Sequence, residues 1–441
     1  MSAPRYRNAA LFVIFGFMLG AAAGAAVWAV LKVMSLGIFF LWTRLPELTG
    51  AESGYAKVIY YFSVYLAGGA VIGLFQKKYG ILPETLETVM GRLKRDGTYP
   101  YDKLHILTIA ALLPLIFGGC LGPEAGLTGI IVGLCCWAGD KLKYKGRQVR
   151  ELAEAGMAAT LGVIFNAPFY GLANNIEHGD TDPGDSDTEK NDEDDGVSAA
   201  RMKKAKAAVY VAGVAGGFLT MGLLSHFFGG GFGLARFTAD MDISLHNWVW
   251  FPLAAVSGIA IGVLYRVVEK ATGTIAAKIA EHRVASCIIV GGCLASLGLV
   301  FPWAMFSGEE QLGDLMDQWR SIPATVLILT VFVKVLLVNV CLSFGWRGGN
   351  IFPVIFSGAA CGYAVTALTG IDPLFGTAVC AAAVCGYMMR KPVTAAAILF
   401  LCFPMRAFIP LAAAAFIGSL IPVPWAKPQK TGKEKHRQSK K

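Results

Sequence analysis

The chain has 441 residues, of which 55% are hydrophobic and only 16% are charged, and its mean hydropathy is +0.55. This is more apolar sequence than one soluble core requires, so the composition indicates a membrane protein. The net charge of +9 does not indicate nucleic-acid binding, because the basic residues lie at the chain ends and in short loops.

Long apolar runs predict the membrane helices, since a helix of roughly 20 residues crosses a bilayer core. The first run, Ala9 to Val30, is too long for the core of a signal peptide and is predicted to be a transmembrane helix. Further long runs lie at 106–119, 209–224, 248–264, 322–345 and 407–423. The runs at 127–139 and 394–403 are short and bounded by Gly or Pro, which indicates partial or re-entrant helices.

Basic residues at both ends of the chain predict its orientation. Arg5 and Arg7 precede the first apolar run, and the tail at 427–441 is rich in lysine. By the positive-inside rule both termini are expected in the cytoplasm, which requires an even number of crossings. The tail is also a candidate for binding acidic membrane lipid, although a solvated tail without that role is the simpler interpretation.

An acidic segment at 179–199 divides the chain near its middle and is predicted to be a disordered loop. A calcium-binding loop is disfavoured, because the bidentate Glu and internal Gly of an EF-hand are not in register. We therefore expect a first transmembrane repeat over 1–178 and a second over 200–426. The basic cytoplasmic tail at 427–441 follows the second repeat.

Two glycine-rich segments interrupt the apolar sequence, GGCLGPEAG at 118–126 and GWRGGNIFP at 345–353. Lipid cannot satisfy the amides of a broken helix, so such breaks survive only where they line a cavity or hold a ligand. A helix that begins at a break presents free N–H groups and the positive end of its dipole to an anion. Two breaks in corresponding halves of the chain predict a transport protein with inverted repeats.

No enzyme, metal site or cofactor is predicted. The ten cysteines lack metal-ligand spacing, and the sequence contains no HExxH, GxSxG or Walker-type motif. An intramembrane enzyme would need paired catalytic groups at one depth, whereas Glu124 and His178 are isolated in separate segments. An intramembrane enzyme or a non-conducting scaffold is the alternative from another class.

The motifs resemble those of the CLC family of chloride channels and proton-coupled anion transporters. GGNIFPVIFSGAACG at 348–362 is similar to that family's GxFxP segment, and Phe165-Asn166-Ala167-Pro168 to its Phe-Asn-Ala-Pro helix. Gly119 to Pro123 takes the place of the Gly-Lys/Arg-Glu-Gly-Pro motif, and KPVT at 391–394 resembles the start of the last pore helix. The ordered set extends over about residues 10–425.

This resemblance implies an all-α polytopic membrane protein of two inverted-topology repeats with broken and re-entrant helices. It also implies a homodimer with an anion pathway in each protomer, and no cofactor. We expect the amides of both breaks to converge on one cavity near mid-membrane. The pathway residues implied are Gly80, Leu121, Gly122, Pro123, Glu124, Ala125, Gly349, Asn350, Ile351, Phe352, Met405 and Arg406.

One departure from the family pattern concerns the gate. Leu121 stands where the family has a mobile, proton-carrying glutamate, and leucine can neither mimic an anion nor bind a proton. Glu124 follows three residues later, one turn along the next helix, and is a candidate for the displaced gate. Alternatively, the carboxylate of Glu124 only stabilises the N-terminus of its own helix.

Other departures concern the ligands. Gly80 takes the place of the family's serine. Met405 or Arg406 takes the place of its tyrosine, and Ile351 takes the place of its phenylalanine. The inner proton-relay glutamate falls at His178, with Glu177 beside it, so these two residues and Glu124 are the proton-pathway candidates.

We therefore predict passive transport of small inorganic anions, chloride first, across the cell membrane. The alternative is a proton-coupled antiporter of chloride, fluoride or nitrate that uses Glu124 and His178. Small residues at 209–224 and 407–423 are predicted to let helices pack between the two protomers.

Overall fold

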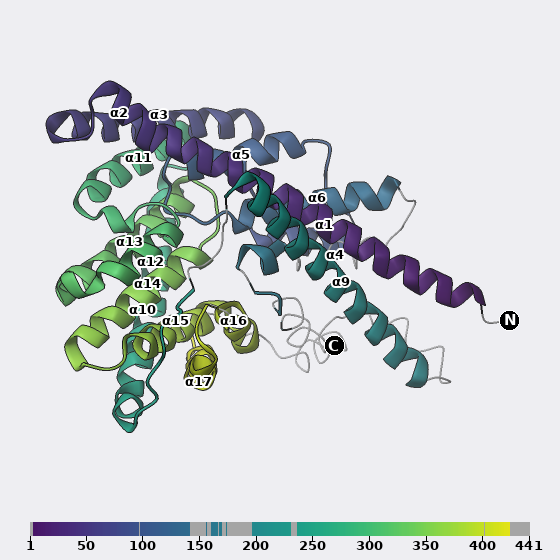
Figure 1. Ribbon diagram of the computed structural model, residues 1–441. Coiled ribbons are helices and arrows are strands. Elements are labelled where there is room, and N and C mark those ends of the chain that lie inside the picture. Colours follow the sequence, from purple (N-terminus) through teal and green to yellow (C-terminus); the bar gives the residue numbers. More distant parts are fainter. Residues whose placement is uncertain are drawn as a thin grey trace, which may run out of the picture.

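Figure 1 shows the computed structural model of the chain, which is built from helices of very different lengths. It describes residues 3–96, 98–141, 196–230, 236–400 and 402–423, together with 156, 160–165, 167–169 and 173. Within these residues the only β-type pairing is an isolated bridge between Gly122 and Gly349.

Seven regions of the described chain are helical, long and apolar enough to cross a membrane. Their main helices are α1 (Ala3–Phe39), α3 (Gly54–Tyr79), α9 (Gly196–Phe228), α10 (Leu245–Lys278), α11 (Arg283–Val300), α13 (Ala324–Phe344) and α14 (Ile351–Thr369). The predicted all-α polytopic architecture is confirmed.

Shorter helices lie between the long ones. They are α2 (Leu45–Thr49), α4 (Leu86–Asp96), α5 (Leu104–Ile116), α6 (Glu124–Lys141), α12 (Glu309–Gln318), α15 (Pro373–Met389), α16 (Pro392–Leu399) and α17 (Phe408–Leu420). The apolar segments expected to be partial helices correspond to α6 and α16. Each of these two helices has proline at or just before its first residue, where the missing N–H costs nothing.

Helices α1 and α9 lie side by side along much of their length (Figure 1). A Cβ atom on Gly20 would overlap the backbone of Gly213, and one on Gly24 would overlap that of Gly217. The small residues of α9 therefore allow close approach within one chain. This glycine-bearing face is occupied by α1 of the same chain, and contact between α9 and a second protomer stays a prediction.

The small residues of α17 are used in the same way. Gly418 lies against the backbone of Ala383 on α15, and Gly386 of α15 lies against that of Ala415 on α17. This face of α17 is thus occupied by α15, and contact between α17 and a second protomer stays a prediction. Its larger side chains, such as Phe416 and Leu420, stay exposed.

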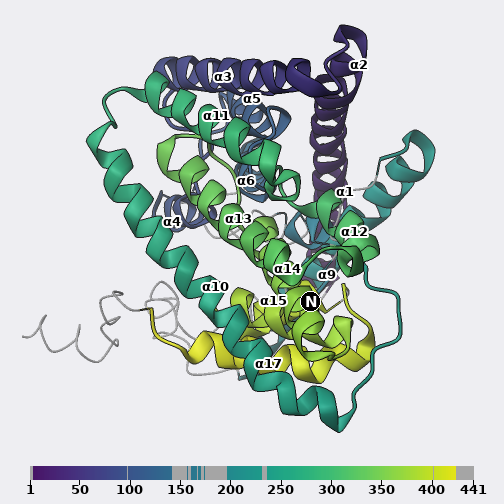
Figure 2. The ribbon, with the colours of Figure 1, turned by 90° about the vertical axis from the view of Figure 1, so that its left-hand side faces the viewer.

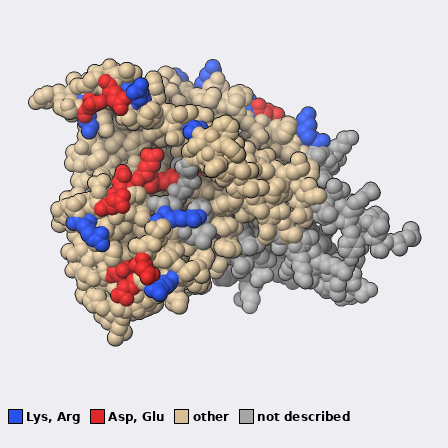
Figure 3. Space-filling model, viewed as in Figure 1, with Lys and Arg blue, Asp and Glu red and all other residues tan. Residues whose placement is uncertain are grey.

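The centre of the molecule holds α14 and α15, between α10 and α13 (Figure 2). Nearly every residue of α15 is buried, and its alanines and glycines let the neighbouring helices approach closely. Figure 3 shows charged residues confined to small groups on a largely uncharged face, as expected for a surface that lies in lipid. This packing places the start of α14 inside the protein, where Ile351 is partly buried and Phe352 is fully buried.

Candidate functional site

The two glycine-rich breaks lie side by side, as expected, whereas their convergence on one cavity near mid-membrane stays a prediction. The N–H of Gly122 donates to the carbonyl oxygen of Gly349 at 2.8 Å, and the N–H of Gly349 donates to that of Gly122 at 2.7 Å. These two amides satisfy each other and are not available to a ligand. The next amides, those of Ile351 and Phe352 at the start of α14, are the ones that could bind an anion.

A buried carboxylate already occupies the start of α14. Oε1 of Glu124, the first residue of α6, accepts a hydrogen bond from the N–H of Ile351 at 2.8 Å, and the amide of Phe352 also faces the carboxylate. Oε2 is buried without a hydrogen-bond partner. Glu124 therefore stabilises the N-terminus of a helix from the other half of the chain, which is the place where an anion would bind.

Glycine leaves room for this carboxylate on both sides. A Cβ atom on Gly349 would overlap Cδ of Glu124, and one on Gly122 would overlap Oε2. The two glycines thus leave a cradle that one carboxylate fills. Both were identified from the sequence as break residues, but their contact with Glu124 depends on the tertiary fold.

Leu121 has no polar role in this arrangement. It is fully buried, and its Cβ atom lies 2.8 Å from the position that a Cβ on Gly348 would take. Its side chain packs against the second break as an apolar spacer. The carboxylate that could act as a gate therefore comes from the next helical turn.

The second break is held by aromatic residues of two other segments. The amide nitrogen Nδ2 of Asn350 donates to the hydroxyl of Tyr265 on α10 at 3.0 Å. Phe352 stacks on Phe165, with ring centroids 5.0 Å apart, so the first residue of the Phe-Asn-Ala-Pro motif lies against α14. Tyr265 was missed in the sequence, where nothing distinguishes it from other aromatic residues of an apolar run.

A buried lysine, Lys334, and the first break both form hydrogen bonds with the turn at 302–308. Nζ of Lys334 donates to the carbonyl oxygens of Met305 at 3.0 Å and Phe306 at 2.8 Å. In the same turn, the carbonyl oxygen of Ala304 accepts a hydrogen bond from Sγ of Cys120 at 3.1 Å. A lysine within an apolar run is a detectable signal that sequence reasoning passed over.

Gly80 ends α3 with a φ of +92°, a conformation that favours glycine. Three residues later, Pro83 lies 3.9 Å from the position that a Cβ on Gly126 would take, in the first turn of α6. The turn that begins at Gly80 thus reaches the helix that carries Glu124. A ligand role for Gly80 stays a prediction.

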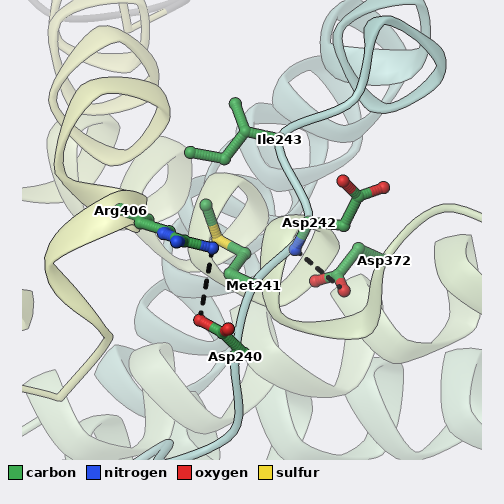
Figure 4. Close-up of a pocket in the computed structure, with 6 residues that line it drawn as sticks. All are labelled: Asp240, Met241, Asp242, Ile243, Asp372 and Arg406. Carbon is green, nitrogen blue, oxygen red and sulfur yellow. Dashed lines mark hydrogen bonds and ion pairs between the residues drawn. The ribbon is translucent and has the colours of Figure 1, made fainter.

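Arg406 lies in a different setting (Figure 4). It forms an ion pair with Asp240 at 3.4 Å and lines a pocket that also contains Asp242 and Asp372. Asp372 accepts hydrogen bonds from the first amides of α15, so its charge is already used as a helix cap. Neither break lines this pocket, and Met405 is exposed, so the pathway role of Met405 and Arg406 stays a prediction.

Two proton-pathway candidates, Glu177 and His178, lie outside the described residues, as do residues 179–195 of the acidic segment. The prediction of a disordered loop is wrong for residues 196–199, because they form the first turn of α9. Pro123 and Ala125 flank Glu124 and are buried with it. The groups that the structure brings together are therefore the two breaks, the carboxylate of Glu124 and the start of α14.

Comparison with known proteins gives relatives of the same kind. Proteins named ion-transport protein YfeO, from Salmonella newport and Salmonella typhimurium, are 25% identical over 394 residues and cover 86% of each chain. A CLC-type fluoride/proton antiporter has a similar fold, with a TM-score of 0.71 and 15% identity over 94% of this chain and 96% of its own. A slow cyanobacterial Cl⁻/H⁺ antiporter has a TM-score of 0.72 and 15% identity, with 93% of both chains covered.

The family model described as voltage gated chloride channel matches residues 68–422, which include both breaks and the helices that meet there. The resemblance found in the motifs is thereby confirmed, and the chain belongs to the voltage gated chloride channel, or CLC, family of anion transport proteins.

Proposed function

We propose that this chain moves small inorganic anions, chloride first, through a pathway that passes the N-terminus of α14. The carboxylate of Glu124 competes with the anion for the amide of Ile351. Protonation would neutralise the carboxylate and weaken its hold on the helix end, because hydrogen bonds to charged groups are the stronger ones. Flux is therefore expected to rise as the pH falls.

The observation that supports this proposal is the 2.8 Å hydrogen bond between Oε1 of Glu124 and the N–H of Ile351. The bond joins two helices that are far apart in sequence, at a helix end with the partial positive charge that attracts anions. A carboxylate that served only its own helix would not need to reach α14.

Glu124→Gln in reconstituted liposomes tests the gate. Glutamine keeps the shape but cannot bind and release the proton, so chloride flux should become independent of pH. At neutral pH it should exceed wild-type flux by about fivefold, because a neutral acceptor holds the helix end less tightly. Glu269→Gln, an exposed carboxylate paired with Arg266 on α10, is the matched control and should behave as wild type. A Glu124→Gln variant that keeps the wild-type pH profile would refute the gate.

Proton-coupled exchange is the second candidate function. It is favoured by a titratable gate inside the pathway and by two similar structures that are titled as proton antiporters. Passive transport, favoured by Leu121, is the competing mode. Measuring proton movement against a proton gradient, driven by a chloride gradient, separates them: uphill movement indicates exchange and its absence indicates passive transport.

The transport unit we propose is a homodimer in the cell membrane, with one pathway per protomer and both termini in the cytoplasm. Exposed apolar side chains, including Phe416 and Leu420 of α17, are available for contact with lipid or a second copy. Crosslinking in mild detergent measures the oligomeric state, and a fully active monomer would contradict the dimer.

A further inference from the structure

Cations in the interior of this protein generally have partners. Lys334 is fully buried, but its ammonium group donates to two carbonyl oxygens and lies 4.9 Å from the ring centroid of Phe356. Even Arg390, which is exposed beside the start of α16, donates to the carbonyl oxygen of Ser419 at 2.7 Å. Such contacts offset the cost of removing a charge from water.

Arg347 is different. It lies in the second break, it is partly buried, and its Nε atom is buried without a hydrogen-bond partner. Across the described parts of the chain, no carboxylate forms an ion pair with its guanidinium. A guanidinium carries five N–H donors and stays charged in proteins, so the buried Nε–H is left without an acceptor beside a charge that no described carboxylate pairs.

The neighbours of Arg347 fix its place beside the proposed pathway. Its chain neighbours are anchored: Nε1 of Trp346 donates to the carbonyl oxygen of Cys287 at 3.0 Å, and Gly348 packs against Leu121. Cys287, which lies near the guanidinium, carries a thiol and not a carboxylate. The positive charge of Arg347 thus lies two residues before Gly349, and within the described residues the nearby carboxylate of Glu124 bonds the start of α14 and forms no ion pair with it.

We propose that Arg347 binds a small monovalent inorganic anion, as a subsite separate from the α14 end that Glu124 occupies. This proposal rests on the proposed anion transport and adds to it a second site, where an anion binds before it reaches the end of α14. An anion held by Arg347 completes the hydrogen bonds of the guanidinium and neutralises its charge. The anion then lies one short step from the helix end, ready to enter when Glu124 leaves.

The test compares chloride flux as a function of chloride concentration in liposomes. Arg347→Gln should raise the half-saturating chloride concentration about tenfold, because it removes the charge-assisted hydrogen bonds, while the maximal rate stays close to wild type. Arg347→Lys keeps the charge and should stay within about threefold of wild type. Arg320→Gln, which removes a guanidinium stacked on Trp319, is the charge-matched control and should leave the half-saturating concentration unchanged.

A direct measurement uses bromide, whose anomalous scattering identifies it in crystals of the wild-type protein. A bromide peak at the Arg347 guanidinium, absent in Arg347→Gln, supports the subsite whether or not the protein transports anions. Wild-type crystals without that peak at saturating bromide would overturn it, as would an unchanged half-saturating concentration in Arg347→Gln. Equal loss of maximal rate in the Gln and Lys variants would show a structural role instead. A wild-type protein without anion flux would refute the proposed function separately.

Discussion

Gly349→Ala should force the gate open. The added Cβ atom would overlap the carboxylate carbon of Glu124, and the far end of that flexible side chain is what must move. Gly349 does not have a positive φ, so alanine adds no backbone strain, and its N–H can still pair with Gly122. The substitution therefore acts mainly on the carboxylate.

The size of the effect follows from the bond that is lost. A hydrogen bond between a carboxylate and an amide contributes about 1.5–3 kcal/mol, and each 1.4 kcal/mol is a factor of ten in population. The fraction of protomers with a vacant α14 end should thus rise by roughly 10- to 150-fold. Chloride flux at neutral pH should increase toward the flux that wild type reaches in acid.

Liposome flux at neutral and acidic pH measures this outcome, with thermal unfolding in detergent as a check on folding. Gly313→Ala on α12 is the matched control, because a Cβ atom there meets nothing within 4 Å. A folded Gly349→Ala protein with wild-type flux and wild-type pH dependence would show that Glu124 does not block the pathway.

Two further substitutions test the packing that supports the site. Gly20→Leu should separate α1 from α9 at Gly213 and lower the unfolding temperature, since overpacking costs about 1–3 kcal/mol. Gly222→Leu is the control, because a side chain there enters open space and should leave the unfolding temperature unchanged. An equal fall in unfolding temperature in both variants would contradict the proposed contact. Lys334→Met should leave two carbonyl oxygens without donors, at about 1–3 kcal/mol each, and reduce both unfolding temperature and flux, whereas Lys334→Arg should retain more of both. Unchanged stability in Lys334→Met would show that the turn at 302–308 does not need its ammonium group.

The sequence was sufficient to predict the helical membrane fold and the two breaks, because long apolar runs and glycine clusters are local signals. It also identified Glu124 as a candidate gate. The partner of that carboxylate could not be predicted, since Ile351 lies 227 residues away and only the tertiary fold brings the two together.

The same limit explains what was missed or misplaced. Tyr265 contacts Asn350 through a hydroxyl that looks ordinary in an apolar helix. The glycines of α9 indicated close helix packing correctly, but a small-residue pattern does not say whether the neighbouring helix belongs to the same chain. In this protein the neighbour is α1.

The reciprocal pair of hydrogen bonds between Gly122 and Gly349 has a mechanical consequence. It links the start of α6 to the start of α14, and each helix belongs to a different half of the chain. Sliding one half past the other would break both bonds in a region where no bulk water replaces them. We therefore expect the two halves to move together at this point. The pathway would then open by rotation of the Glu124 side chain while the backbone pairing of Gly122 and Gly349 stays in place.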